Sequence, residues 1–408
     1  MSLLLKIKNS PKLKLGLIII GSLVALGILF FASIYFGAWG KLPSSKELSE
    51  LQQSRATQVL SSEGQLIGKF YIHDRQPVKY EEFPQHLIDA LIATEDVRFY
   101  NHSGIDSRSL MRVFFKSILL QDESAGGGST ITLQLAKNIY GRKDYGFLGI
   151  VVNKFQEVVI ANRLEGTYDK KNIIRLYFNT VPFSDNTFGI ESASMKFFGK
   201  HTSELNIEES AVLVGMLKAS HYYNPRIFPE RSKQRRNVVL SQMEKYDFIS
   251  KEKEKEAQEA ELVLNYKNYG HDKGLAPYFR EQVRKDVSKV LDTLKNKDGK
   301  KYNIYRDGLI VHTTLNYRMQ ELAEESMQEH MAALQEQHEK SYGEATPWKR
   351  NPKILEDAIK SSRPYKNLEN EGLSAEEIMA ELDRTRPMEL FEYNGTVTKT
   401  ASVKDSIE

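Results

Sequence analysis

The sequence predicts a mostly α-helical protein that lies behind one membrane-spanning helix and continues into a small α+β module. Three observations support this fold class. An uncharged run occupies residues 15–40, close to the N-terminus. Apolar residues then recur at helical spacing from about residue 84 to residue 246. After residue 246 the pattern changes to charged helical runs that alternate with strand-like stretches.

The uncharged run 15–40 predicts a single membrane span. At about 1.5 Å per residue, this helix is longer than a hydrocarbon core of about 30 Å. Tyr35 and Trp39 lie near its end, where amphipathic rings favour the interface. Four lysines and no acid precede it, so we expect residues 1–14 to form a cytoplasmic tail and the rest to lie on the outer, periplasmic side of the inner cell membrane. A cleaved signal peptide is the alternative, but its apolar core would be only about 7–15 residues long.

The exposed part is expected to comprise a polar stalk at 41–60, one mostly α domain at 61–246 and a linker module at 247–408. Residues 61–64 read as a turn between two strand-like runs. Helical spacing predicts helices over 86–100, 107–120, 130–140, 150–165, 170–179, 189–197, 207–218 and 231–246. In the linker module we expect helices over 276–294 and 316–340, a strand over 309–315, and a hairpin over 388–400.

The composition excludes several classes of protein. Apolar residues make up 40% and charged residues 27% of the 408 residues, so most of the chain should fold. The formal net charge is +3 and the first fourteen residues alone carry four lysines, so a basic nucleic-acid-binding protein is disfavoured. The absence of cysteine excludes disulfides, cysteine-bound zinc, iron–sulfur clusters and thiol catalysis. The motifs of serine hydrolases, zinc proteases and penicillin-reactive serine enzymes are also absent.

A first candidate motif joins adjacent acids to aromatic and histidine residues. Glu95 and Asp96 end a helical stretch, and Phe99 and His102 follow. Cations rather than anions suit a helix C-terminus, so carboxylates there are costly unless a ligand or a basic partner meets them. The motif therefore indicates either a functional acid pair or surface acids beside a structural histidine, and these residues alone leave both interpretations open.

A second motif joins three glycines, 126–128, to a helix with a polar face. The glycines allow close approach of the backbone to a ligand, and Ser129 or Thr130 can cap the helix. One face of this helix suits a pyrophosphate or a sugar, although the P-loop order is absent. A capped helix with a solvated face is the alternative. The residues on that face are Thr130, Gln134, Lys137 and Asn138.

A third motif places Lys154 and Glu157 three residues apart on one helix face. By itself this pair is more typical of an ordinary surface ion pair than of a functional site.

These three motifs, in this order behind one membrane anchor, resemble the peptidoglycan glycosyltransferases of family 51, which form the N-terminal catalytic half of class A penicillin-binding proteins. The resemblance spans about residues 55–246. Residues 247–408 resemble the linker that precedes a transpeptidase domain in such proteins, and because the chain stops at Glu408 we expect no penicillin-sensitive activity. Further matching segments are 174–183, 189–193, 197–200, 209–215, 223–225 and 235–240.

The resemblance implies a lysozyme-like fold that polymerises lipid II into β-1,4 glycan strands, with inversion and release of undecaprenyl pyrophosphate. It implies that Glu95 is the base, that Glu157 is a second acid orienting the donor, and that Lys137 and Lys154 stabilise the leaving pyrophosphate, with room for a divalent cation such as Mg²⁺ whose ligands are unknown. The partners implied are lipid II, the growing strand, membrane lipid and other cell-wall synthesis proteins. The remaining residues expected to shape the cleft are Asp96, Phe99, His102, Ser129, Thr130, Gln134 and Asn138.

The sequence departs from the family at three positions. Leu133 stands where the first glutamine of a Gln-Gln pair is usual, Asn153 replaces a usual arginine before Lys154, and Ser184 replaces a usual glycine. The first two remove polar contacts near the expected pyrophosphate site.

Two other functions compete with this interpretation. A lysozyme-like lytic enzyme would also use a glutamate in an α-helical domain, but it would not need a cationic face for pyrophosphate. A non-catalytic membrane scaffold would not need the pair Glu95 and Glu157. Apolar residues at 113–115 and 118–120 suit either contact with the membrane interface or packing in the core.

Overall fold

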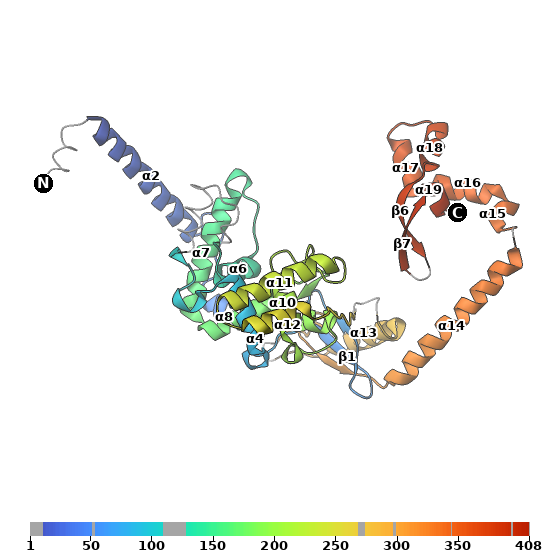
Figure 1. Cartoon of the computed structure of the whole chain (residues 1–408), viewed down its shortest axis with the longest axis horizontal. Helices are drawn as coiled ribbons and strands as arrows, with labels where there is room; N and C mark the ends of the chain where they lie inside the picture. The colour runs from blue at the N-terminus through green and yellow to red at the C-terminus, as the bar shows by residue number, and fades with distance from the viewer. Residues whose placement is uncertain are drawn as a thin grey trace. The chain divides into compact units, whose positions relative to one another are not determined.

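The computed structural model describes residues 11–50, 54–108, 128–267, 274–296, 299–343, 345–392 and 395–407. Contacts divide the chain into two units, Met1–Tyr317 and Arg318–Glu408, and each is described here by itself. Figure 1 labels many of their elements. The sequence analysis starts the linker module at residue 247, whereas the second of these two contact units starts at Arg318.

The first unit is built mainly from helices, as the sequence predicts. Its helical spacing is confirmed for every predicted helix from 130–140 onward in this unit, and the helix predicted over 86–100 ends earlier, at Glu95. The predicted helix 107–120 lies outside the described residues beyond Arg108. The helices are α2 (Pro11–Tyr35), α3 (Ser45–Ser49), η1 (Tyr80–Glu82), α4 (Gln85–Glu95), η2 (Phe99–Asn101), α6 (Ile131–Tyr140), η5 (Gly146–Leu148), α7 (Gly149–Thr167), α8 (Lys170–Thr180), α9 (Ile190–Phe197), η6 (Thr202–Glu204), α10 (Ile207–Met216), α11 (Pro229–Lys245), α12 (Lys251–Glu259) and α13 (Pro277–Leu291).

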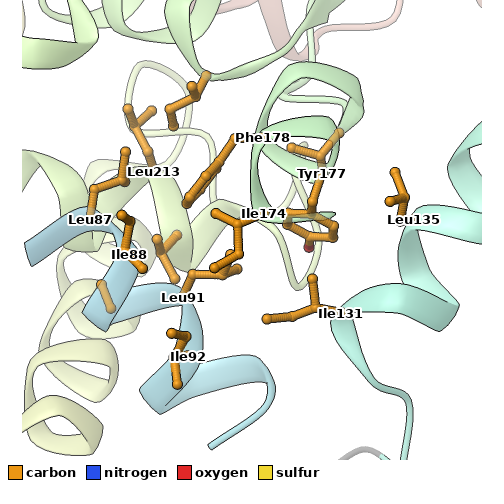
Figure 2. Close-up of a cluster of buried hydrophobic side chains, with 14 of the residues drawn as sticks. Leu87, Ile88, Leu91, Ile92, Ile131, Leu135, Ile174, Tyr177, Phe178 and Leu213 are labelled. Carbon is orange, nitrogen blue, oxygen red and sulfur yellow. The ribbon is translucent and has the colours of Figure 1, made fainter. Parts of the chain in front are cut away.

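The core of this unit lies where α4, α6, α8 and α10 meet. Leu87 and Leu91, four residues apart, lie on one face of α4 and are fully buried. Figure 2 shows this face turned toward Ile174 and Phe178 of α8 and Leu213 of α10. Each such side chain contributes about 1.5–3 kcal/mol by leaving water. The last residue of α4 is Glu95, where the first candidate motif begins.

A three-stranded sheet joins distant parts of the first unit. Strand β1 (Thr57–Leu60) pairs antiparallel with β2 (Leu66–Phe70), which confirms the predicted turn at 61–64. On its other side β1 pairs in parallel with β5 (Ile310–His312), with Gln58 opposite Ile310. Because β5 completes this sheet, the chain up to Tyr317 belongs with the first unit rather than with the module predicted to start at residue 247. A second, two-stranded sheet joins β3 (Asp74–Arg75) in parallel to β4 (Thr187–Phe188).

Helix α2 contains most of the run predicted to cross the membrane. Its described side chains include exposed apolar residues from Leu15 to Leu29. Within the described part of the chain, no helix combines the length and the apolar character required to cross a membrane. The single span therefore stays a prediction.

The described part of the segment predicted as a polar stalk contacts the first unit. Leu42 and Leu48 are buried in the core of the first unit. The carbonyl oxygen of Pro43 accepts a hydrogen bond from Arg163 at 2.8 Å, and that of Leu48 accepts one from the Tyr168 hydroxyl at 2.8 Å. These two leucines reach the core while their polar neighbours stay at the surface, so the segment packs along α7.

The second unit is a small α+β module. Its buried cluster is formed by Ile359, Tyr365, Ile378, Leu382 and Val403. The predicted long helix and hairpin are confirmed, and four short helices precede the hairpin where the sequence analysis assigns no structure. The elements are α14 (Tyr317–Tyr342), α15 (Pro347–Arg350), α16 (Pro352–Ser361), α17 (Arg363–Asn370), α18 (Ala375–Leu382), β6 (Arg386–Glu392), β7 (Gly395–Ala401) and α19 (Val403–Ile407).

Candidate active site

Glu95 is the last residue of α4, and a chain of two hydrogen bonds fixes one of its carboxylate oxygens. Gln134 on α6 donates from Nε2 to Oε2 of Glu95 at 2.7 Å. The hydroxyl of Tyr177 on α8 donates to Oε1 of the same glutamine at 3.0 Å. Burial, and after it the charge of Glu95, raises the pKa of Tyr177 well above its usual value, so this hydroxyl keeps its proton. The glutamine amide is thereby held with its NH₂ group toward Glu95.

Asp96 and His102 form a buried brace between α4 and α6. Nε2 of His102 lies 3.0 Å from both oxygens of Asp96. The backbone N–H of Gly104 donates to Nδ1 of the same ring, so Nε2 carries the proton that is donated to Asp96. Asp96 also accepts the N–H of Ile131, the first residue of α6, at 3.1 Å. This brace sets the position of α6 relative to the end of α4.

Phe99 and Thr130 are part of the same brace rather than of an open surface. Phe99 is fully buried, and the ammonium group of Lys170 lies 4.3 Å from its ring centroid. Thr130 is the N-cap of α6, because its Oγ1 accepts the N–H of Leu133 at 3.1 Å, and the same hydroxyl donates to the carbonyl of Gly104 at 2.6 Å. The predicted cap is therefore confirmed, and it is Thr130 rather than Ser129.

Glu157 lies buried on α7 with a cation at each carboxylate oxygen. Lys154 donates to Oε2 at 3.1 Å and also to the hydroxyl of Ser129 at 2.9 Å. Arg142 donates from Nε to Oε1 at 3.0 Å, and its Nη2 lies 3.0 Å from the same oxygen. The pair that resembles a surface ion pair in the sequence is thus a three-membered cluster around a carboxylate with only 6% of its side chain exposed.

Lys137 and Asn138 lie on α6, one turn after Gln134. Lys137 is exposed, and none of the described side chains forms a hydrogen bond or an ion pair with its ammonium group. Asn138 is half-buried beside it. Lys137 therefore keeps its positive charge available to a ligand.

Helix α6 brings the two groups of residues together. Ser129 immediately precedes its N-cap and contacts the cationic cluster, while Gln134 in its second turn contacts Glu95. The glycines at 126 and 127 and the apolar residues at 113–115 and 118–120 lie outside the described residues.

The arrangement around Glu157 fits a divalent cation poorly. Both of its oxygens already face cationic side chains, and a metal ion would have to displace one of them. Among the described residues, no three acidic or histidine side chains are grouped closely enough to hold a metal. Binding of Mg²⁺ stays a prediction, and no ligands for it are assigned.

Two residues of this site are not among the candidates from the sequence. Tyr177 lies in a segment that matches the family, 174–183, but nothing in its spacing connects it to Glu95. Arg142 lies fifteen residues before Glu157 in a loop, and no periodic pattern relates the two. Contacts of this kind become visible only in three dimensions.

Comparison with known proteins gives two family matches. Residues 63–244 match the family described as "Transglycosylase", and residues 343–408 match the "Penicillin-binding protein middle domain". "Penicillin-binding protein 1A" of Aquifex aeolicus is 34% identical over 322 residues, which cover 78% of this chain and 41% of the relative. The protein of the same name from Vibrio cholerae is 33% identical over 329 residues, which cover 80% and 38%. The chain therefore spans about two fifths of the length of these relatives.

A solved structure also matches. The crystal structure of penicillin-binding protein 1A from Haemophilus influenzae has 25% sequence identity and a TM-score of 0.37, with 66% of this chain and 28% of that chain covered.

Proposed function

We propose that the protein is a peptidoglycan glycosyltransferase of cell-wall synthesis, and the match of residues 63–244 to the transglycosylase family supports this. It polymerises lipid II into β-1,4 glycan strands and releases undecaprenyl pyrophosphate. The observation that carries the proposal is that α6 contacts Glu95 through Gln134, while Ser129, just before the same helix, contacts the cations around Glu157. Transfer of a sugar from a diphosphate needs both a base and positive charge.

The reaction forms one bond and breaks another at the anomeric carbon of the donor sugar. The 4-hydroxyl oxygen of the acceptor attacks this carbon from the face opposite the diphosphate, so the configuration inverts. The bond between the anomeric carbon and the diphosphate oxygen breaks, and its electron pair leaves with the diphosphate. The hydroxyl proton passes to Glu95. Positive charge at the leaving group lowers the barrier because negative charge develops there in the transition state.

The structure around Glu95 supports its role as the base. Gln134 holds Oε2, whereas Oε1 makes no hydrogen bond to any described residue. One oxygen is therefore oriented and the other remains open to a proton. The core sets the orientation of the Glu95 carboxylate, because Gln134 is itself held by the buried Tyr177.

Lys154 and Lys137 are proposed to stabilise the leaving diphosphate. Lys154 uses one N–H for Ser129 and one for Glu157, which leaves a third for the ligand. Lys137 is free of such contacts within the described residues. Glu157 is proposed to orient the donor through the cations that it holds rather than by direct contact, because both of its oxygens are engaged. No step is derived through a divalent cation.

The protein is proposed to act at the outer face of the inner membrane, with its N-terminus in the cytoplasm. Exposed apolar side chains along α2 support this location, since lipid is the surrounding that suits them. At the end of α2, Phe31 packs edge-to-face against Phe155 of α7, with ring centroids 5.5 Å apart. This contact would hold the site close to a lipid-linked substrate. Membrane lipid, lipid II, the growing strand and other cell-wall synthesis proteins are the proposed partners.

The test is polymerisation of lipid II by the full chain in detergent. General base catalysis contributes about 10²- to 10⁴-fold, so Glu95→Gln should lower the rate by at least about 100-fold. Glu259→Gln, on the exposed surface of α12, is the matched control and should polymerise normally. Near-normal chain synthesis by Glu95→Gln would refute the assignment of the base. Shortened products from added glycan strands would indicate a lytic enzyme instead.

A further inference from the structure

The loop between α6 and α7, residues 141–148, delivers a second cation to Glu157. Arg142 lies near the start of this loop, and its Nε and Nη2 each lie 3.0 Å from Oε1 of Glu157. Lys154 occupies the other oxygen from within α7 itself. Unlike Lys154, Arg142 has no regular secondary structure to fix its position, so something else must hold this loop in place.

Asn153 holds it through three hydrogen bonds to backbone groups. Its Oδ1 accepts the N–H of Lys143 at 3.0 Å, and its Nδ2 donates to the carbonyl of Lys143 at 2.8 Å. The same Nδ2 donates to the carbonyl of Gly149 at 2.7 Å. The amide therefore fixes both backbone groups of the residue next to Arg142 and also ties the loop to the start of α7. Asn153 is itself buried, with 5% of its surface exposed.

The held guanidinium keeps donors for a ligand. It has five N–H groups, and its contacts to Glu157 use those at Nε and on one side of Nη2. The side chain of Arg142 is 57% exposed, so the remaining N–H groups face solvent. With Lys154 and Glu157 the cluster carries a formal charge of about +1, assigned from the ordinary charges of these groups. A planar fork of this kind matches the geometry of phosphate oxygens.

We infer that Asn153 is a positioning residue, which acts through the 141–148 loop to hold the guanidinium of Arg142 against Glu157 and so preassembles the cation cluster that meets the leaving diphosphate. This inference rests on the proposed function. It assigns to Asn153 no contact with substrate. Its consequence is that the effects of losing Asn153 and of losing Arg142 do not add, because the first acts only through the second.

The experiment is a double-mutant cycle on the full chain, measured by lipid II polymerisation in detergent. Arg142→Ala should lower kcat by about 10- to 100-fold with little change in KM, because the lost charge acts in the transition state. Asn153→Ala should lower kcat by a similar or smaller factor, and the double variant should be no slower than Arg142→Ala alone. Lys143→Ala is the control: it also removes one positive charge from this loop, but it keeps the backbone groups that Asn153 binds. It should therefore retain wild-type kcat.

A second variant guards against misfolding. Asn153→Asp has the same size and keeps an acceptor for the N–H of Lys143, but it loses both donors. Because its buried carboxylate would face two carbonyl oxygens, it should unfold at a lower temperature than the wild type, and the assay is run below that temperature. In the folded variant we expect the same non-additive loss of kcat with Arg142→Ala.

Three outcomes would overturn the inference: full multiplication of the two effects in the double variant, wild-type kcat in both Asn153 variants, or an equal loss in Lys143→Ala. The proposed function fails separately, if the wild-type chain makes no polymer or if Glu95→Gln keeps its rate. The cycle therefore distinguishes a wrong role for Asn153 from a wrong reaction.

Discussion

Tyr177 makes no contact with substrate in the proposed mechanism, and yet its hydroxyl should matter for the reaction. This hydroxyl donates to Gln134 at 3.0 Å, and Gln134 in turn donates to Glu95 at 2.7 Å. Tyr177→Phe removes the first bond and leaves the core packing intact, because the two side chains differ by one oxygen. Gln134→Ala removes the second bond directly. We predict that both variants slow polymerisation and that they do so through one path.

The magnitudes follow from the kinds of bond lost. A hydrogen bond between neutral groups contributes about 0.5–1.5 kcal/mol net, so Tyr177→Phe should lower kcat by about 2- to 10-fold. A hydrogen bond to a charged group contributes about 1.5–3 kcal/mol, so Gln134→Ala should lower kcat by about 10- to 150-fold. If Tyr177 acts only by orienting Gln134, the double variant should equal Gln134→Ala. Because the pKa of Tyr177 is raised, this hydroxyl does not titrate near neutral pH. The pH profile of kcat for Tyr177→Phe should therefore match that of the wild type there.

The assay is again lipid II polymerisation by the full chain, with thermal unfolding measured beside it. Tyr168→Phe is the matched control, since it loses one hydrogen bond, 2.8 Å long, from a tyrosine whose partner is the carbonyl of Leu48. It should cost a similar amount of stability and leave kcat unchanged. If the effects of Tyr177→Phe and Gln134→Ala multiply in the double variant, the relay through the glutamine is wrong.

Three further predictions concern stability. Asp96→Ala leaves His102 and a backbone N–H without their buried acceptor, and chemical denaturation should show a loss of about 2–5 kcal/mol, whereas a loss under 1 kcal/mol would contradict the brace. A hydrogen bond with Glu191 raises the pKa of His201, so this contact stabilises the fold fully below about pH 6.5 and is lost as the pH rises through the folded pKa. His201→Gln should therefore unfold at a lower temperature than the wild type near pH 5.5. An equally large difference in unfolding temperature near pH 8.5 would refute this. Gly189→Ala should cost more than about 1 kcal/mol in the same denaturation assay, because its φ is +82° and a Cβ would lie 3.1 Å from a backbone oxygen, and an unchanged midpoint would count against it.

Helical periodicity predicts the architecture of the first unit well because the apolar stripes are local. The spacing in α4, α6, α7 and α8 reflects one buried face on each helix, and such a face can be found without knowing its partner. The pairing of β5 with β1 has no such signal. The hydroxyl of Thr313, just after β5, donates to the carbonyl of Leu60, 253 residues earlier in the chain. A strand of only three residues carries no pattern that identifies the strand with which it pairs.

The sequence identifies the candidate residues more readily than it identifies the role of each one. Asp96, Phe99 and His102 belong to the first motif, but they are buried in a brace between helices, and a motif does not show which of its polar residues face inward. Ser129 and Lys154 do meet, although they lie 25 residues apart and the sequence connects them only through a family resemblance. Their roles in catalysis stay predictions until the variants are measured.

The arrangement around Glu157 explains why its role is hard to infer from sequence. A glutamate three residues after a lysine on a helix is usually a weak surface pair. Here the loop from α6 adds Arg142 at the second oxygen, so each oxygen of the buried carboxylate meets one cation, at 3.0 and 3.1 Å. Each of these contacts is attractive and partly offsets the repulsion between the two cations. The carboxylate of Glu157 therefore lets two cations lie close together before any diphosphate binds. In the proposed mechanism its role is to hold these two positive charges in place.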